Sequence, residues 1–470
     1  MQTLLLNEDR FFSPVPEVRK LARELYESVK NFPIVSPHGH VDPAIFSENK
    51  PFPDPARLFL LPDHYLYRML YSQGIPMESL GILDKEGRGE ETDARKIWRL
   101  FASKYHLFRG TPSRAWLDYE FHIVFGIDER LSAESADRIY DELQEKINSS
   151  EFLPRALFEK FNIEALNTTD AASDNLIHHI QMRKDGWEGK VLPCFRPDAV
   201  TDLTNPSWYA NIKLLGESAG MEITGYKTYI HALEKRREFF ISMGAVSTDH
   251  GVFSPYTHRL TDEEAVTLFH RALKGEQTTQ DASLFTAHML MEMARMSCED
   301  GMVMQIHAGA HRNHNELIYA KYGPDKGCDI PRQTEYTENL KELLNTYGND
   351  SRFTLIVFTL DETNYARELA PLAGHYPAMK LGPAWWFHDS IEGMTRYRQM
   401  VTETAGFYNT VGFNDDTRAF VSIPARHDLA RRVDSNFLAE LTAKHIIERN
   451  EAFELAADLT YNLVKKAYKL

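Results

Sequence analysis

The sequence contains few cysteines, no long apolar run and no excess of positive charge. Only Cys194, Cys298 and Cys328 occur among 470 residues, and no CxxC motif is present. Their odd number and wide spacing argue against a disulfide framework and fit a reducing compartment. No stretch approaches the roughly 18 apolar residues of a membrane span, and the first residues reach charge too early for a signal peptide. We therefore expect a cytoplasmic protein without a membrane partner.

Acidic residues outnumber basic ones, 68 to 53, so the formal net charge is -15. Nucleic acid binding depends on clustered Lys and Arg that neutralise phosphates, and this composition argues against a nucleic acid partner. An anionic substrate would need a site that is locally positive. The hydrophobic fraction of 43% is that of a globular chain with a large core.

Short apolar stretches alternate with helical patterns eight times along the chain, which predicts an α/β fold of the (β/α)8 TIM barrel type. The expected strands are Ile34–His40, Ile163–Asp170, Lys190–Arg196, Ala245–His250, Met302–Ala308, Phe353–Asp361, Ala378–Trp386 and Thr410–Arg418. The clearest helical stretches are Thr228–Ser242, Leu284–Cys298, Thr337–Tyr347 and Ile391–Ala405, with two more near Phe437–Asn450 and Ala452–Leu470.

One interval breaks this alternation. Residues 43–158 separate the first two strands, and they are predicted to be mostly helical, with aromatic-rich segments. We expect an inserted helical subdomain there. The predicted units are an N-terminal segment with the first strand (1–42), the insertion (43–158), and the rest of the barrel with its C-terminal helices (159–470).

Barrel enzymes carry their functional groups at the C-terminal ends of the strands. The first strand ends in His38-Gly39-His40, and residues two apart on a strand face the same side. The fifth ends in His307 and the eighth in Asp416. Such groups can converge on a cation. The alternatives are hydrogen-bonded surface histidines, a satisfied core histidine at 307, and an Asp416 that caps a helix or pairs with a neighbour.

Three arginines follow strand ends: Arg196, Arg312 and Arg418. Because arginine holds carboxylates in bidentate geometry, together they suggest an anion site. Singly, each is better explained by pairing with a nearby acid, as Arg196 can with Asp198.

Aromatic and hydroxyl groups occur at two further places that could cover the barrel mouth. Asp63-His64-Tyr65 lies in the insertion, and Trp385-Trp386 ends the seventh strand. They can form a wall and a proton-transfer group there. The alternative is packing of the insertion on the barrel.

The ligand layout, with HxH on strand one, His on strand five and Asp on strand eight, resembles that of the amidohydrolase superfamily. Within it the chain is similar to the uronate isomerase family over nearly its whole length. The matching segments are His38-Gly39-His40, Asp63-His64-Tyr65, Thr168-Thr169-Asp170, Arg196-Pro197-Asp198, Ser247–His250, His307–Ala310 with Arg312-Asn313, Gly323-Pro324-Asp325, Trp385-Trp386-Phe387, Asp416-Thr417-Arg418 and Arg426-His427.

The resemblance implies an isomerase that interconverts D-glucuronate with D-fructuronate and D-galacturonate with D-tagaturonate by proton transfer through an enediol. It implies one divalent metal, because strand four carries Thr248-Asp249-His250 where two-metal relatives have a bridging lysine. Histidine and aspartate ligands suit zinc, with manganese or iron as alternatives. We also expect a homo-oligomer.

The resemblance also suggests roles for individual residues. His38, His40 and Asp416 would bind the metal, with His307 a fourth ligand or a near neighbour. Tyr65 or Asp416 would move the proton, supported by His64. The remaining candidates would contact the uronate: Arg196, Arg312, Arg418, Asp249, His250, and Trp385 or Trp386. Two other functions fit the same residues: a mononuclear metal-dependent hydrolase of this superfamily, and a non-catalytic sugar-acid binding protein.

Overall fold

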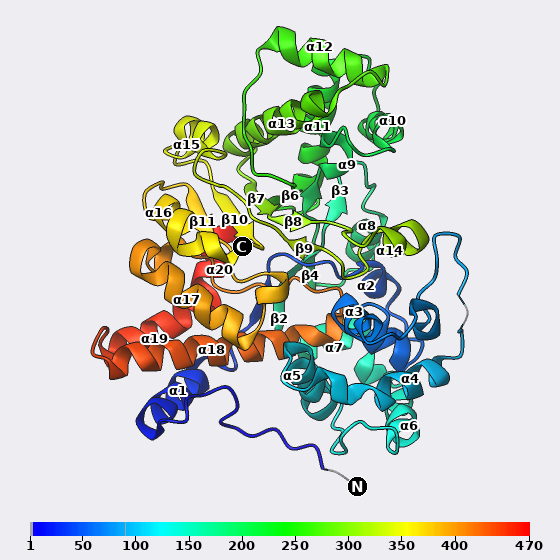
Figure 1. Ribbon diagram of the computed structural model, residues 1–470, viewed down its shortest axis with the longest axis vertical. Helices are drawn as coiled ribbons and strands as arrows, with labels where there is room; N and C mark the ends of the chain where they lie inside the picture. Colours follow the sequence, from blue (N-terminus) through cyan, green and yellow to red (C-terminus); the bar gives the residue numbers. More distant parts are fainter. Residues whose placement is uncertain (1–2, 90) are drawn as a thin grey trace.

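The strands form the predicted parallel barrel. The computed structural model describes residues 3–89 and 91–470 (Figure 1). In chain order the barrel strands are β1 (Ile34–Ser36), β2 (Ile163–Asn167), β3 (Asp170–Ala171), β4 (Lys190–Leu192), β5 (Phe195–Arg196), β6 (Ser247–Gly251), β7 (Val303–Ala308), β10 (Leu355–Thr359) and β11 (Met379–Leu381). Their pairing runs β1-β2-β4 and β11-β10-β7-β6-β5-β3, all parallel.

The two groups of strands belong to one curved sheet. β3 continues β2, and β5 continues β4, after short interruptions. Backbone hydrogen bonds bridge the interruption, from Thr168 to Leu192 at 2.9 Å and from Asp170 to Cys194 at 3.0 Å. Strands β7 and β10 are buried along their whole length, as expected when helices cover the outside of a parallel sheet.

The eighth strand is much shorter than predicted. Of the expected Thr410–Arg418, only Thr410 pairs, as an isolated parallel bridge to Leu381. Gly412 and Asp416 have φ of +78° and +39°, outside the β region, so the backbone cannot continue a ladder. A backbone hydrogen bond of 2.9 Å from His40 to Thr417 joins this segment to the residues after β1. The segment therefore takes the eighth position as a loop.

Between β1 and β2 the chain is helical, in agreement with the prediction for this interval. Its α-helices are α2 (Ala44–Glu48), α3 (His64–Ser72), α4 (Ala94–Ser103), α5 (Pro112–Tyr119), α6 (Ala136–Ile147) and α7 (Pro154–Lys160). They gather on one side of the molecule (blue to cyan in Figure 1) around a hydrophobic cluster that includes Trp98 and Phe101. Ile34 and Ile163 of the barrel join the same cluster. A separate subdomain at 43–158 stays a prediction.

Most other helices follow barrel strands. They are α8 (Ile177–Lys184), α9 (Asp198–Thr201), α10 (Trp208–Ala219), α11 (Tyr226–Ser242), α12 (Asp262–Leu273), α13 (Thr279–Asp300), α14 (Glu316–Tyr322), α15 (Lys341–Tyr347), α16 (Ala370–Ala373) and α17 (Ile391–Ala405). The sequence marks several of their starts: Thr261 and Thr278 form capping boxes with the side chains three residues on, and Ser390 caps α17.

The first of the two predicted C-terminal helices differs from the structure. A single helix α18 (Ile423–Ala443) replaces the expected helix near Phe437–Asn450. It starts earlier, with Pro424 in its first turn, where a missing N–H costs no hydrogen bond. It ends before His445, whose φ is +57°. The expected helix Ala452–Leu470 is present as one helical stretch: α19 (Arg449–Ala457), the π-helical segment η11 (Asp458–Asn462) and α20 (Leu463–Tyr468).

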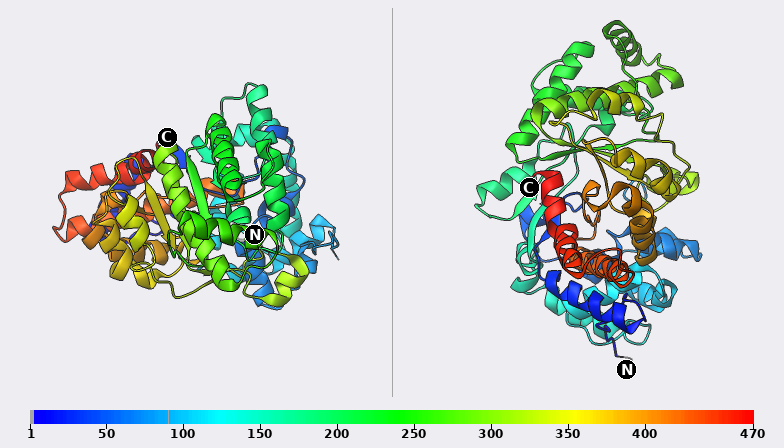
Figure 2. Two further views of the ribbon diagram at one scale, coloured as in Figure 1. Left: turned by 90° about the horizontal axis from the view of Figure 1, so that it is seen from above. Right: turned by 90° about the vertical axis from the view of Figure 1, so that its left-hand side faces the viewer.

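The N-terminal and C-terminal segments of the chain pack at the N-terminal end of the barrel. Helix α1 (Pro16–Val29) packs along α18, and the C-terminal segment (red in Figure 2) lies beside the barrel strands. Tyr468 donates a hydrogen bond of 2.8 Å to Gln305 on β7. The N-terminal end of the barrel is thus closed, and the opposite end is open for a site. No helix in the described part of the chain combines the length and hydrophobicity needed to cross a bilayer.

Candidate functional site

A cavity of about 530 Å³ opens at the C-terminal ends of the barrel strands. It is lined by nearly all of the residues that the sequence singled out: His38, His40, His64, Arg196, Asp249, His307, Arg312, Trp385, Trp386, Asp416 and Arg418. These residues come from strand ends or following loops around the barrel and from the insertion. The barrel topology, rather than proximity in sequence, brings them together.

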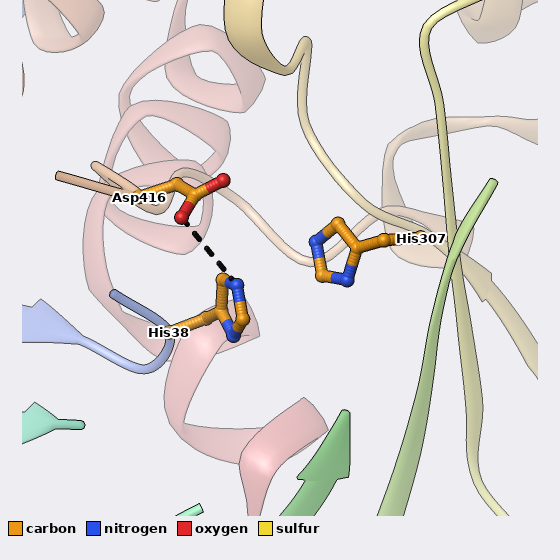
Figure 3. Close-up of side chains that lie close together, drawn as sticks. All are labelled: His38, His307 and Asp416. Carbon is orange, nitrogen blue, oxygen red and sulfur yellow. Dashed lines mark ion pairs between the residues drawn. The ribbon is translucent and has the colours of Figure 1, made fainter. Parts of the chain in front are cut away.

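His38, His307 and Asp416 point toward one another in the cavity (Figure 3). One ligand atom from each lies within 4.8 Å of those of the other two. His38 Nε2 is 3.5 Å, and His40 Nε2 is 3.3 Å, from Asp416 Oδ1. His38 and His307 stack with ring centroids 4.6 Å apart. The group suits a divalent metal, and His40 lies at its edge.

The donor atoms of this group fit a cation. Within residues 3–89 and 91–470, the buried atoms His307 Nε2 and Asp416 Oδ1 have no hydrogen-bond partner. Buried polar atoms of this kind normally have one. Burial lowers the pKa of His38 to about 4, so its imidazole is neutral at neutral pH and has a lone pair to offer.

A buried carboxylate orients His307. Asp249 at the end of β6 lies 2.6 Å from His307 Nδ1, and both side chains are almost fully buried. This contact leaves His307 Nε2 facing the cavity. Burial opposes the ionisation of Asp249, but Arg196, 3.3 Å away, and His307 outweigh it and hold the pKa of that carboxyl well below its usual range. A carboxylate behind a histidine is the usual partner of a metal-binding imidazole.

Two guanidinium groups converge beside this centre. A Cβ built on Gly251 would lie 2.4 Å from Arg196 Nη2 and 3.0 Å from Arg312 Nη2. The missing side chain therefore makes room for both cations at one point. Arg196 also pairs with Asp198 at 2.7 Å, and Asp198 accepts from the Gly251 N–H. Two adjacent guanidinium groups form a binding place for a carboxylate.

The segment from 310 to 331 covers one side of the cavity. It contains the antiparallel pair β8 (Ala310–His311) and β9 (Ile330–Pro331), with α14 between them. Arg312 pairs with Asp329 at 3.2 Å, and Arg418 pairs with Asp325 at 3.1 Å. Burial opposes ionisation of Asp325, but Arg418 outweighs it and lowers the pKa of that carboxyl.

Sequence reasoning did not assign these two acids a role. Asp325 stood within a recognised motif, and Asp329 follows Cys328. The signal that would have found them is charge balance: three arginines in one cavity need acidic partners.

His64 and Tyr65 begin α3, capped by Asp63, whose carboxylate accepts from the Tyr65 N–H at 2.8 Å. His64 lines the cavity and contacts Trp386, with ring centroids 4.3 Å apart. Tyr65 lies behind the lining, and its hydroxyl donates to the Trp386 carbonyl at 3.3 Å. Burial raises the pKa of Tyr65 above its usual range, so the phenol keeps its proton.

His250 also lies outside the cavity lining. It is buried, with Nε2 3.0 Å from the Thr248 hydroxyl, and burial lowers its pKa to about 3. As the neighbour of Asp249 on a strand, it faces the opposite side.

The two tryptophans have different contacts. Trp385 packs against His307, and the Trp386 indole N–H donates to the Asp329 carbonyl at 3.1 Å.

Four residues of the cavity lining have backbone angles that are unusual outside glycine. Asp416 and Trp386 have φ of +39° and +55°, and Asn313 and Asp325 on the covering segment have +55° and +61°. Such angles are costly for residues other than glycine and persist where the surrounding structure holds them. These four residues line the cavity, although other non-glycine residues with positive φ lie elsewhere in the described chain.

Comparison with known proteins points to one family. The sequence pattern of the glucuronate isomerase family matches residues 8–468. The uronate isomerase of Brucella canis is 56% identical over 467 residues, covering 99% of this chain and 100% of the relative. Among solved structures, glucuronate isomerase from Caulobacter crescentus superposes with a TM-score of 0.98 at 54% identity, covering 100% and 98% of the two chains. Uronate isomerase from Thermotoga maritima gives 0.92 at 27% identity, covering 99% of each.

Proposed function

The chain belongs to the glucuronate isomerase family and interconverts the aldose and ketose forms of uronates, and on this premise we propose that the cavity at the barrel mouth is its active site. The observation that carries the proposal is the convergence of His38, His307 and Asp416 beside the two guanidinium groups at Gly251. Family membership favours isomerisation over the hydrolase and binding-protein alternatives. The expected pairs are D-glucuronate with D-fructuronate and D-galacturonate with D-tagaturonate.

We propose that one divalent cation binds His38, His40 and Asp416, with His307 as a fourth ligand or a near neighbour. The unpartnered buried nitrogen and oxygen atoms of this group support it. Zinc suits such ligands best, with manganese or iron as alternatives. When bound, the cation would stabilise negative charge that develops on the sugar oxygens.

We propose that the uronate carboxylate binds between Arg196 and Arg312. Their guanidinium groups meet where Gly251 leaves space, and a carboxylate there can accept from both. Arg418, which lines the same cavity two residues after Asp416, would then hold hydroxyl groups of the sugar. Asp249 and one tryptophan of the pair Trp385-Trp386 would contact the sugar. Because the carboxylate fixes one end of the open chain, C1 and C2 are directed toward Asp416.

We propose that the proton moves between C2 and C1 through an enediol. Asp416 lines the cavity, and His38 and His40 lower its pKa against the opposing effect of burial, so its carboxylate is ionised. This carboxylate is the group that would take the proton. Tyr65, which keeps its proton behind the cavity lining, is the alternative group for moving the proton. His64, between Tyr65 and the cavity, would support that transfer.

Isomerisation in heavy water tests this mechanism. During turnover of D-glucuronate and D-galacturonate, NMR should show ketose formation and solvent deuterium at C1 or C2, because a proton held by Asp416 can exchange. Asp416→Asn and Tyr65→Phe should be slow. Complete retention of the original hydrogen over many turnovers, with near-normal rates in both variants, would contradict proton transfer but leave isomerisation itself intact. If neither sugar gives a ketose product, the isomerase function is contradicted.

Cytoplasmic residence and a homo-oligomeric state remain proposals. All three cysteines are free thiols, which supports a reducing compartment. Light scattering of the purified protein measures the oligomeric state, and a monomer would contradict that expectation.

A further inference from the structure

A second cavity lies at the N-terminal ends of β1 and β2, away from the barrel mouth. It has a volume of about 530 Å³ and is lined in part by Ile34, the first residue of β1, and Asn162, which directly precedes β2. Its charged lining residues are Arg10, Lys30, Lys160, Arg431, Arg432 and Asp428. We call it the basal hollow. Five cationic side chains thus face one carboxylate in a chain whose net charge is -15.

The single carboxylate of the basal hollow is already in use. Asp428 pairs with Arg10 at 2.5 Å and with Arg432 at 2.9 Å, and it also accepts from the Tyr26 hydroxyl. Lys30 pairs with Glu27 outside the lining. These contacts leave the positive charge of the hollow largely unbalanced.

Arg431 is a buried cation of the basal hollow without an acidic partner. It is 8% exposed, and its two Nη atoms donate to the carbonyls of Lys30, Phe32 and Pro33 at 2.6–3.2 Å. Its Nε has no hydrogen-bond partner within the described ranges, and no carboxylate there lies within ion-pair distance of it. Buried charges normally have a counter-charge, because removal from water is costly. Lys160 also lacks an acidic partner in this part of the chain; its Nζ lies 3.4 Å from the Val124 carbonyl and 4.4 Å from the centre of the Phe152 ring.

We propose that the basal hollow binds a small organic anion with a phosphate or carboxylate headgroup. The headgroup would neutralise Arg431 and Lys160, which have no acid of their own. Phe32, Tyr119 and Phe161 line the same hollow and offer apolar surface to the body of the molecule. This site is separate from the isomerase cavity, since it lies at the opposite ends of the strands.

Hydrogen–deuterium exchange with mass spectrometry tests the site by location. Glucose 6-phosphate and gluconate are the probes, inorganic phosphate tests the headgroup alone, and glucose is the neutral control. We expect the two anionic sugars to protect peptides covering 26–34, 119–124 and 158–162. Glucose should not protect them. Protection by glucose 6-phosphate alone would support the site and identify phosphate as its headgroup. Protection only around the barrel mouth, or none, would overturn the proposal.

A variant with matched charge separates this site from general attraction of anions. Lys30→Ala with Lys160→Ala removes two exposed cations of the hollow but keeps Arg431 and the backbone carbonyl at position 30 to which it donates. Lys213→Ala with Lys274→Ala removes two exposed lysines from α10 and the end of α12. We expect at least about tenfold weaker binding in the first pair and unchanged binding in the second. Equal binding by both pairs would overturn the proposal.

Discussion

Replacing Asp249 by Asn should weaken metal binding without removing a metal ligand. Asp249 is 1% exposed and lies 2.6 Å from His307 Nδ1. Asn has the same shape, and its carbonyl oxygen can still accept from that nitrogen, so the imidazole keeps its orientation. What is lost is the negative charge behind His307, which strengthens the binding of a metal by an imidazole.

Two estimates of the effect agree. A hydrogen bond to a charged group contributes about 1.5–3 kcal/mol, and loss of the carboxylate behind a metal-binding histidine lowers affinity by about 10- to 100-fold. That range corresponds to about 1.4–2.8 kcal/mol. We therefore expect Asp249→Asn to raise the dissociation constant for zinc by one to two orders of magnitude, measured by competition with a chelator of known affinity.

Asp198→Asn is the matched control. Both carboxylates contact Arg196, but Asp198 contacts the Gly251 N–H, whereas Asp249 contacts His307. Only the variant at 249 should therefore lose metal affinity, while either can alter uronate binding through Arg196. Equal loss of metal in both variants, or none in either, would refute the role of Asp249 behind His307.

Three further predictions concern the metal, the substrate and the buried support of the site. Elemental analysis should find about one divalent ion per native chain and little in His38→Ala with His40→Ala; two tightly held ions would contradict this. Arg312→Ala should weaken uronate binding by about 1.5–3 kcal/mol but spare a neutral aldose, and equal losses would argue against a carboxylate contact. Arg426→Met leaves the buried Asp389 unpaired and should cost about 3–5 kcal/mol in urea unfolding. Burial raises the pKa of Asp389 to about 7 against the opposing effect of Arg426, so removing Arg426 should raise that pKa further. Both proteins lose stability as Asp389 ionises, but only the variant continues to lose it above about pH 7; the deficit should therefore grow from about pH 7 to about pH 8.5, and a constant deficit would count against this pairing.

The barrel and most of the cavity were predictable because both follow from local patterns. Buried parallel strands are short apolar runs, and the polar residue that ends each run marks the open end of the barrel. His38 and His307 could be placed together on that ground although 269 positions separate them in the numbering. The C-terminal helices were located only approximately, because α18 continues through Arg426 to Arg432 with polar residues that are buried only in the folded chain.

Other features depend on contacts that no local pattern records. Asp416 was assigned to a strand, but its left-handed backbone places it on a loop joined to His40 through Thr417. Asp325 and Asp329 belong to a covering segment whose position is set by its contacts with Tyr67, Arg312, Trp386 and Arg418. Such contacts join distant parts of the chain, so their partners cannot be read from spacing.

By itself, the sequence determined the barrel class, the open end of the barrel and the residue types that gather there. It could do so because the periodicity of each strand, and the order in which strands follow one another along the chain, can be read from local patterns. Only the tertiary structure decided which atoms are free to act. It showed that Asp249 contacts His307 Nδ1 and leaves Nε2 facing the cavity, and that the missing side chain of Gly251 lets Arg196 and Arg312 meet. The physical reason is that burial and pairing set the charge and orientation of a side chain, and both depend on neighbours supplied by other strands.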